Sequence, residues 1–222
     1  MNSATPRREA SPNLQQGLPS TRYNPRRVAV LVIVYAVLCA LCLLWAFRGR
    51  RPPQYPAAEC LVPPVDDYRV DRAFGVRSQD GSEVHLAEDV ELPAYTPVFA
   101  IAPGYVAYAG TAPGFQGIIV VEHRLSDGTV FRSIYGHLEP IAFLVREREI
   151  VTGGQEIGYL AETDDEKDEE LETPRLHFGL RKGPHDPWVW EAYGWGPEEL
   201  LTEYYEPSAF LAAHRCQRAQ GE

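Results

Sequence analysis

The chain has 222 residues, which is enough for one domain of moderate size with additional segments. Its charge is uneven, because residues 52–222 carry 13 basic and 30 acidic side chains, a formal charge of −17. This acidic balance excludes nucleic acid as a partner, since binding to phosphates requires a basic surface.

The chain begins with a polar segment, residues 1–27, rich in Pro, Ser, Asn, Gln and Arg and without apolar periodicity. Such a composition cannot bury enough apolar surface to fold, so a disordered tail is expected. The last six residues, 217–222, are likewise expected to form a tail.

Residues 28–47 (VAVLVIVYAVLCALCLLWAF) form a run of 20 residues without a charged side chain. A helix of this length spans the hydrocarbon core of a bilayer, about 30 Å thick. The alternatives are a buried core helix and a cleaved signal peptide. A signal peptide has an apolar region of about 7–15 residues and small residues at its cleavage site, which Trp45–Arg48 does not provide. The run therefore predicts one transmembrane helix.

Arginines flank this run unevenly, with five before it and three directly after it. The excess of positive charge before the helix places the N-terminal tail in the cytoplasm and the C-terminal part outside. Cys60 and Cys216 lie in that outer part, where an oxidising compartment would allow them to pair. The sequence leaves open whether they do.

Residues 48–67 contain five prolines and are predicted to form a semi-rigid extended stalk. From residue 68 to residue 216 short alternating apolar stretches are separated by Gly and Pro, as at 96–102, 105–109, 117–122 and 130–135. These stretches predict strands of a compact, mainly β domain with an antiparallel sheet. Short helices are expected only near the end, at 197–205 and 208–215.

Residues 162–172 (ETDDEKDEELE) contain eight acidic side chains and one lysine. Like charges repel and resist burial, so this segment is predicted to be a solvated loop. A functional alternative is a substrate gate, or a docking strip for a basic partner or cations.

All six histidines follow the apolar run, and two of them belong to a potential metal site. His85 and Asp89 share one short segment, and His177 lies in another predicted strand. Two imidazoles and one carboxylate form a three-ligand zinc site with a fourth position for water. Zinc lowers the pKa of such a water to about 7 and so provides a nucleophile at neutral pH.

The sequence around these residues resembles that of the lysostaphin/LytM-type metallopeptidases, the M23 family. The resemblance covers about residues 74–180 and rests on motifs in the same order: His85-x-x-x-Asp89, Pro97–Ala100, Gly104–Val106, Tyr135–Leu138, Gly154–Gly158 and Leu176–Phe178. It implies a compact antiparallel β fold with zinc in a groove. It also implies hydrolysis of peptide bonds in bacterial peptidoglycan. Together with the apolar run 28–47 and its flanking arginines, this predicts a single-pass protein of the bacterial inner membrane with its C-terminal domain outside.

Carried over position by position, His85, Asp89 and His177 match the zinc ligands of the family. His137 in YGHL matches the histidine that serves as general base, a task for which an unperturbed pKa near 6.5 is suitable. His123 matches a frequent histidine that is not a ligand, and a structural role is favoured. His185 and His214 fall outside the motifs and are expected at the surface.

The chain departs from the family pattern at its last motif, where Arg175 replaces the first histidine of His-x-His. Residues two apart on a strand point to the same face, so Arg175 is expected beside His177. A guanidinium can donate hydrogen bonds to an oxyanion, although it cannot act as a base. Alternatively, Arg175 pairs with the acidic segment 162–172 and closes the groove.

Other departures are smaller or lie in loops. Ala87 replaces a usual glycine, and the acidic segment 162–172 replaces a loop that borders the substrate groove in the family. The aromatic segment 187–195 (PWVWEAYGW) follows the last strand. It is expected to cap the hydrophobic core, with a wall of the substrate groove as the alternative.

The sequence therefore predicts a membrane-anchored zinc endopeptidase acting on peptidoglycan, with His137 and Arg175 as catalytic residues. The alternative is a catalytically weak, zinc-binding module that regulates or recruits another cell-wall hydrolase or serves as a scaffold. A zinc peptidase that acts on some other protein also fits the motifs.

Overall fold

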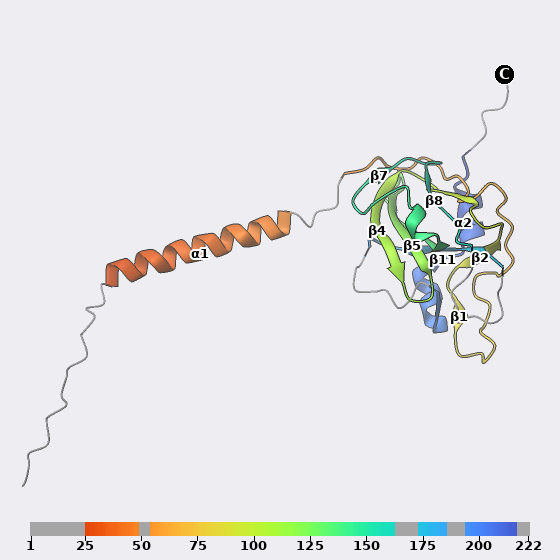
Figure 1. The fold of residues 1–222 in the computed structure, drawn as a ribbon, viewed down its shortest axis with the longest axis horizontal. Coiled ribbons are helices and arrows are strands. Elements are labelled where there is room, and N and C mark those ends of the chain that lie inside the picture. The colour runs from red at the N-terminus through yellow and green to blue at the C-terminus, as the bar shows by residue number, and fades with distance from the viewer. Residues whose placement is uncertain (1–24, 49–53, 163–172, 186–193, 217–222) are drawn as a thin grey trace, which may run out of the picture. The chain divides into compact units, whose positions relative to one another are not determined.

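The computed structural model describes residues 25–48, 54–162, 173–185 and 194–216 (Figure 1). The chain divides into two compact units, residues 1–51 and residues 52–222. Each unit is described by itself.

The described part of the first unit is the helix α1 (Pro25–Arg48), of 24 residues. Within the described parts of the chain, no helix is long and apolar enough to cross a membrane. The transmembrane assignment of residues 28–47 is therefore not confirmed. The tail expected at residues 1–27 lies almost entirely outside the described residues.

The second unit is mainly β, as expected from the alternating apolar stretches. Its elements in chain order are β1 (Val84–His85), β2 (Glu88–Glu91), β3 (Pro97–Phe99), β4 (Gly104–Ala112), β5 (Gln116–Arg124), β6 (Val130–Leu138), η1 (Pro140–Ala142), β7 (Ile150–Val151), β8 (Glu156–Tyr159), β9 (Arg175–Lys182), β10 (Trp195–Gly196), η2 (Glu198–Glu203), β11 (Tyr204–Tyr205) and α2 (Pro207–Ala213).

One antiparallel sheet organises this unit, with the strand order β11-β9-β6-β5-β4-β7. Strand β2 also pairs with β9, along residues Arg175 to Phe178, whereas β11 pairs farther along the same strand. Two small pairs, β1 with β10 and β3 with β8, complete the sheet structure. Figure 1 shows the long strands β4 and β5 side by side.

The central strand β5 contributes residues to both hydrophobic clusters of the core. Its apolar residues are consecutive rather than alternating, and they are buried. Ile119 and Val121 belong to one hydrophobic cluster, while Ile118 and Val120 belong to a second. Because successive side chains of a strand point to opposite faces, both faces of the sheet are covered by apolar residues.

The segment expected to be a stalk is instead part of the domain from residue 54 onward. Ala58 and Leu61 are buried in the core, and the Tyr55 hydroxyl donates a hydrogen bond to the buried Glu122 at 2.9 Å. The backbone of Ala58 also donates to Arg124 O at 2.7 Å. The prolines give this segment an extended conformation, but its apolar side chains bind it to the sheet.

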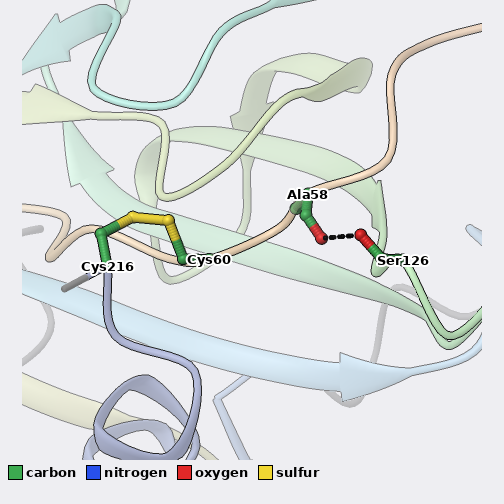
Figure 2. The surroundings of a disulfide bond; sticks show 4 residues. All are labelled: Ala58, Cys60, Ser126 and Cys216. Carbon is green, nitrogen blue, oxygen red and sulfur yellow. Dashed lines mark hydrogen bonds between the residues drawn. A yellow bond between two sulfur atoms is a disulfide. The ribbon is translucent and has the colours of Figure 1, made fainter.

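A disulfide joins Cys60 to Cys216, so the pairing that the sequence left open is present (Figure 2). Beside it, the Ser126 hydroxyl donates to Ala58 O at 3.2 Å. The bond links residues separated by 156 positions and so connects the two ends of the domain. In the chain-entropy model, closing a loop this long stabilises a fold by about 5 kcal/mol, an upper value.

The helices predicted near the C-terminus are present in shortened form. The first is the 3-10 helix η2, which ends where β11 joins the sheet, and the second is α2. α2 begins with Pro207, whose fixed φ suits a first helical position. The core residue Phe210 attaches α2 to the sheet.

His123 is a buried structural histidine of this core, in agreement with the role favoured by its sequence position. Its Nδ1 lies 2.9 Å from Pro103 O, and its Nε2 lies 2.7 Å from the Ser133 hydroxyl. The close packing requires glycine at position 104, where a Cβ would lie 2.6 Å from His123 Nδ1. Burial lowers the pKa of His123 to about 4, although the hydrogen bond to Pro103 acts in the opposite direction.

This shift predicts a loss of stability in mild acid. The unfolded chain takes up a proton at His123 near pH 6.5, whereas the folded chain does so only near pH 4. The stabilising contribution is complete above pH 6.5 and declines as the pH falls towards 4, by on the order of 3 kcal/mol. Urea unfolding at several pH values should show that the unfolding free energy of His123→Gln changes less with pH than that of the parent chain. An unchanged pH dependence of the unfolding free energy in His123→Gln would refute this assignment.

Candidate metal centre and cleft

Strand register brings three sequence-predicted residues together at one end of the sheet. Asp89 of β2 lies directly opposite His177 of β9 in the antiparallel pair. His85 lies in β1, four residues before Asp89, and is paired with Trp195 of β10. Each of the three ligand candidates is at least 97% buried, and their ligand atoms all lie within 4.8 Å of one another.

Two of the three distances within this cluster match the ligand spacing of a small tetrahedral ion, and the third is shorter. His85 Nε2 lies 3.3 Å from both His177 Nδ1 and Asp89 Oδ1, and His177 Nδ1 lies 2.8 Å from Asp89 Oδ1. Two ligands about 2.0–2.1 Å from a tetrahedral zinc are about 3.3 Å apart. The donor set of two imidazoles and a carboxylate is also one that zinc prefers.

The surroundings favour the protonation states that metal binding requires. His85 Nδ1 faces Ala73 O at 3.3 Å, which favours a proton on Nδ1. Nε2 then has no proton, and its lone pair is available to a metal ion in the cluster. Burial lowers the pKa of His85 and so favours the neutral imidazole. Burial raises the pKa of Asp89, but the close approach of the His177 and His85 imidazoles outweighs burial and holds this pKa well below its usual range.

Two arginines approach the other oxygen of the same carboxylate. Arg72 Nη1 lies 3.2 Å from Asp89 Oδ2, and Arg175 Nε lies 3.7 Å from it. Arg175 lies on β9 two residues before His177, as the alternation of a strand predicts, and its side chain is buried. Oδ1 therefore faces the two histidines, while Oδ2 faces the two guanidinium groups.

His137 lies near the cluster, at the end of β6. Its ring centre is 6.0 Å from that of His177, and its side chain is 6% exposed. The backbone of His137 has a φ of 60°, which a non-glycine residue rarely adopts and which often marks a functional site. Gly136, opposite His177, makes room for the ring of Phe115, since a Cβ there would lie 2.6 Å from Phe115.

A cleft of about 580 Å³ contains all five predicted site residues. Its lining also includes three aromatic side chains: Tyr108, Phe115 and Trp195. The ring centre of Phe115 is 5.1 Å from that of His177, and Trp195 is 4.9 Å from His85. The cleft thus combines a polar end at the cluster with apolar walls.

Arg72 and Phe115 were not identified from the sequence, whereas Trp195 belongs to the segment 187–195, for which a wall of the substrate groove was the alternative. Arg72 reaches Asp89 because an isolated antiparallel bridge pairs these two residues. A single bridge of this kind has no periodic pattern in the sequence that would predict it. Phe115 lies in the β4–β5 turn, where Gly114 has a φ of 79°. The sequence Pro113-Gly114 is a turn signal and could have identified the loop, although not what its aromatic ring touches.

The remaining histidines lie outside the cleft. His123 is buried in the core, whereas His185 and His214 are half-buried rather than fully exposed. The backbone of His185 donates to Glu122, and His214 Nδ1 faces Phe210 O. Most of the acidic segment 162–172 and of the aromatic segment 187–195 lies outside the described residues. The structure describes only Glu162 of the first and Gly194 and Trp195 of the second, so the roles predicted for the two segments stay predictions.

The family described as peptidase family M23 matches residues 83–187 of this chain. Lipoprotein NlpD of Yersinia enterocolitica is 36% identical over 85 residues, which are 38% of this chain and 76% of that protein. Cell division protein DipM of Caulobacter vibrioides is 33% identical over 113 residues, which are 50% of this chain and only 16% of that protein. The chain therefore spans a small part of the length of DipM.

Among solved structures, lysostaphin in solution is similar with a TM-score of 0.52 and 22% identity, over 75% of this chain and 59% of that chain. Another structure of lysostaphin, from Staphylococcus simulans, gives a TM-score of 0.51 at the same identity, over 75% and 58%. At this level of identity the similarity supports the fold, which agrees with the antiparallel arrangement described above.

The cluster predicts metal binding that depends on each of its three members. The parent chain should retain about one zinc ion after dialysis, whereas His85→Ala, Asp89→Ala and His177→Ala should each retain far less, because three protein ligands are the usual minimum of such sites. Elemental analysis by mass spectrometry measures the ratio. His214→Ala, outside the cleft, should bind as the parent does. Full occupancy in His177→Ala would exclude this ligand set.

Proposed function

Because the chain belongs to peptidase family M23, we propose that it is a zinc-dependent endopeptidase that cleaves peptide bonds of bacterial peptidoglycan. The observation that carries the proposal is the buried His85–Asp89–His177 cluster, which lines a cleft together with His137. Two of the three ligand distances fit tetrahedral zinc, and the cleft is large enough to admit a peptide segment.

In this proposal His85, Asp89 and His177 hold the ion. Zinc bound there would supply Lewis-acid chemistry, polarising the peptide carbonyl and lowering the pKa of water. His137 acts as general base, accepting a proton on its imidazole and later delivering it to the leaving amine. Phe115 and Trp195 limit the access of water and hold the imidazoles by ring contacts.

Arg175 is proposed to stabilise negative charge that develops on the substrate. It stands where the family usually has a histidine, and its guanidinium lies beside the ligand Asp89. A permanently charged donor in a buried position strengthens interactions with an oxyanion. The required positive charge is therefore retained, although the group cannot exchange a proton.

Removal of the base should abolish turnover without removing the ion. His137→Ala is expected to lower the rate of peptidoglycan cleavage by at least about 100-fold, the usual contribution of general acid–base catalysis. The full chain, loaded with zinc, is incubated with isolated peptidoglycan, and released fragments are identified by mass spectrometry. His214→Ala is the matched control. Cleavage by His137→Ala at the parent's rate would exclude this role for His137, and cleavage by a chelated parent would exclude the metal.

A second candidate function is a peptidase-like regulator that binds zinc but cleaves poorly. The observation that favours it is the contact of Arg175 with Asp89, since this guanidinium competes with the ion for the same carboxylate. Such a module would recruit or activate another cell-wall hydrolase. The complete ligand set and His137 favour the enzyme over this alternative.

Substitution of Arg175 by histidine distinguishes the two functions. If Arg175 supports catalysis, Arg175→His should cleave peptidoglycan within about tenfold of the parent, because a comparable donor is restored. Fragment release, normalised to bound zinc, is the measurement. A gain of several hundredfold would instead assign the natural chain to the regulator class.

We also infer that residues 28–47 attach the domain to a membrane, with the domain on the extracytoplasmic side. The run has no charge over 20 residues, and consecutive large apolar side chains of α1 are exposed, from Val30 to Tyr35. Membrane attachment would remove this surface from water. The Cys60–Cys216 disulfide fits an oxidising compartment.

Membrane attachment predicts that the full chain remains with the membrane fraction in alkaline carbonate. Detergent should release it, because only detergent replaces the lipid around an apolar helix. A chain lacking residues 1–51 is the control and should be recovered in the soluble fraction. Release of the full chain by alkali alone would contradict the attachment.

A further inference from the structure

The two carboxylate oxygens of Asp89 have different partners. Oδ1 lies 2.8 Å from His177 Nδ1 and 3.3 Å from His85 Nε2, within the ligand cluster. Oδ2 accepts a hydrogen bond from Arg72 Nη1 at 3.2 Å, and Arg175 Nε lies 3.7 Å from it, an ion-pair distance. A carboxylate can bind a metal ion through one oxygen or through both. These contacts favour Oδ1 alone as the ligand atom.

The backbone of Arg72 is fixed against the strand that carries Asp89. Asp89 N donates to Arg72 O at 2.9 Å, and Arg72 N donates to Asp89 O at 3.3 Å. These bonds form the isolated antiparallel bridge between two residues that are 17 positions apart. Directly opposed residues of an antiparallel pair have their side chains on the same face. The bridge therefore places the guanidinium of Arg72 within reach of the Asp89 carboxylate.

The indole of Trp195 contacts both Arg72 and the ligand candidate His85. The guanidinium carbon of Arg72 lies over the indole, 5.6 Å from the ring centre, which is a cation–π distance. The ring centre of His85 lies 4.9 Å from that of Trp195, with 38° between the two planes. Arg72 and Trp195 contact each other, and between them they touch two of the three ligand candidates. Packing of this kind restricts rotamers and so fixes a metal-binding side chain in one orientation.

Arg72 acts on a cation at this site in two opposite ways. Its charge repels the cation, whereas its hydrogen bond orients the carboxylate that binds it. The side chain of Arg72 is 28% exposed, so water and salt weaken the repulsion. Partners that orient a metal-binding side chain strengthen metal binding by about 10- to 100-fold. Orientation is therefore expected to outweigh repulsion at Arg72.

We propose that Arg72 and Trp195 together are positioning residues that restrict Asp89 to one ligand oxygen, so that the site selects a four-coordinate ion such as zinc. Ions that prefer six oxygen ligands, such as Mn²⁺, would gain from a carboxylate that binds through both oxygens. In this role the two residues act through Asp89 and His85. The inference rests on the zinc site of the proposed function and does not depend on hydrolysis.

The zinc affinity of Arg72 variants tests the proposal. Arg72→Met removes the donor and the charge but keeps an unbranched side chain. In the full chain it should bind zinc at least about tenfold more weakly than the parent, measured by competition with a chromogenic chelator. Arg72→Lys retains a charged donor and should recover part of this loss. An unchanged or higher zinc affinity in Arg72→Met would overturn the proposal, because repulsion would then equal or outweigh orientation.

Cobalt reports the number of ligands directly, because four-coordinate Co²⁺ absorbs visible light much more strongly than five- or six-coordinate Co²⁺. The Co²⁺-loaded parent should show the strong absorption, and Arg72→Met should lose most of it when Oδ2 of Asp89 becomes a ligand. The preference of the site for zinc over Mn²⁺ should fall in the same variant. Identical cobalt spectra in the two chains would refute the restriction of Asp89 to one oxygen.

A double-mutant cycle tests whether Arg72 and Trp195 act together. Trp195→Leu should also weaken zinc binding, and the double variant should lose less affinity than the product of the two single losses. A loss equal to that product would refute their joint action. Arg146→Met is the matched control, since Arg146 pairs with Glu149 at the surface and does not line the cleft. It should retain the zinc affinity and the cobalt spectrum of the parent.

Peptidoglycan cleavage separates this proposal from the proposed function. If the parent cleaves peptidoglycan while Arg72→Met keeps its zinc affinity and cobalt spectrum, the positioning role is refuted and the peptidase remains. If Arg72→Met loses zinc affinity and the strong cobalt absorption while the zinc-loaded parent releases no fragments, the positioning role is supported and the peptidase is refuted.

Discussion

The carboxylate of Asp89 is the interaction on which the rest of the site depends. Its backbone is fixed twice, by pairing with His177 across β2 and β9 and by the isolated bridge to Arg72. One oxygen then faces both histidines, and the other faces both arginines. A buried charge is tolerated only when it is paired. The ligands and the cationic groups therefore occupy one site because each balances the same negative charge.

This arrangement connects the two functions considered for the chain. In the proposed peptidase, the arginines orient Asp89 and add positive charge to the cleft, which would stabilise charge formed during hydrolysis. The same positive charge opposes a bound cation, which explains how a complete ligand set could be combined with weak activity. The two proposed functions therefore require the same residues. They differ in whether the arginines mainly orient Asp89 or mainly repel the bound cation.

The remainder of the domain holds this site in place. The long strands β5 and β6 are buried on both faces, and β6 carries His137 beside the ligand strand β9. At the other end, Cys60 and Cys216 join the two ends of the domain, and the segment from residue 54 covers the core through Ala58 and Leu61. A rigid sheet closed at its termini gives the ligand side chains the fixed positions that a preorganised site requires.

The sequence by itself determined the β class and the long strands, because apolar stretches separated by Gly and Pro are local properties of the chain. The grouping of His85, Asp89, His177 and His137 came from the resemblance of short motifs to those of the M23 family. It also placed Arg175 beside His177, since a strand has a period of two. Only the tertiary structure decided that Arg72 shares Asp89, that Phe115 and Trp195 wall the cleft and that the proline-rich segment packs on the core. These contacts join residues far apart in the chain through irregular backbone, and their formation depends on packing that no local period encodes.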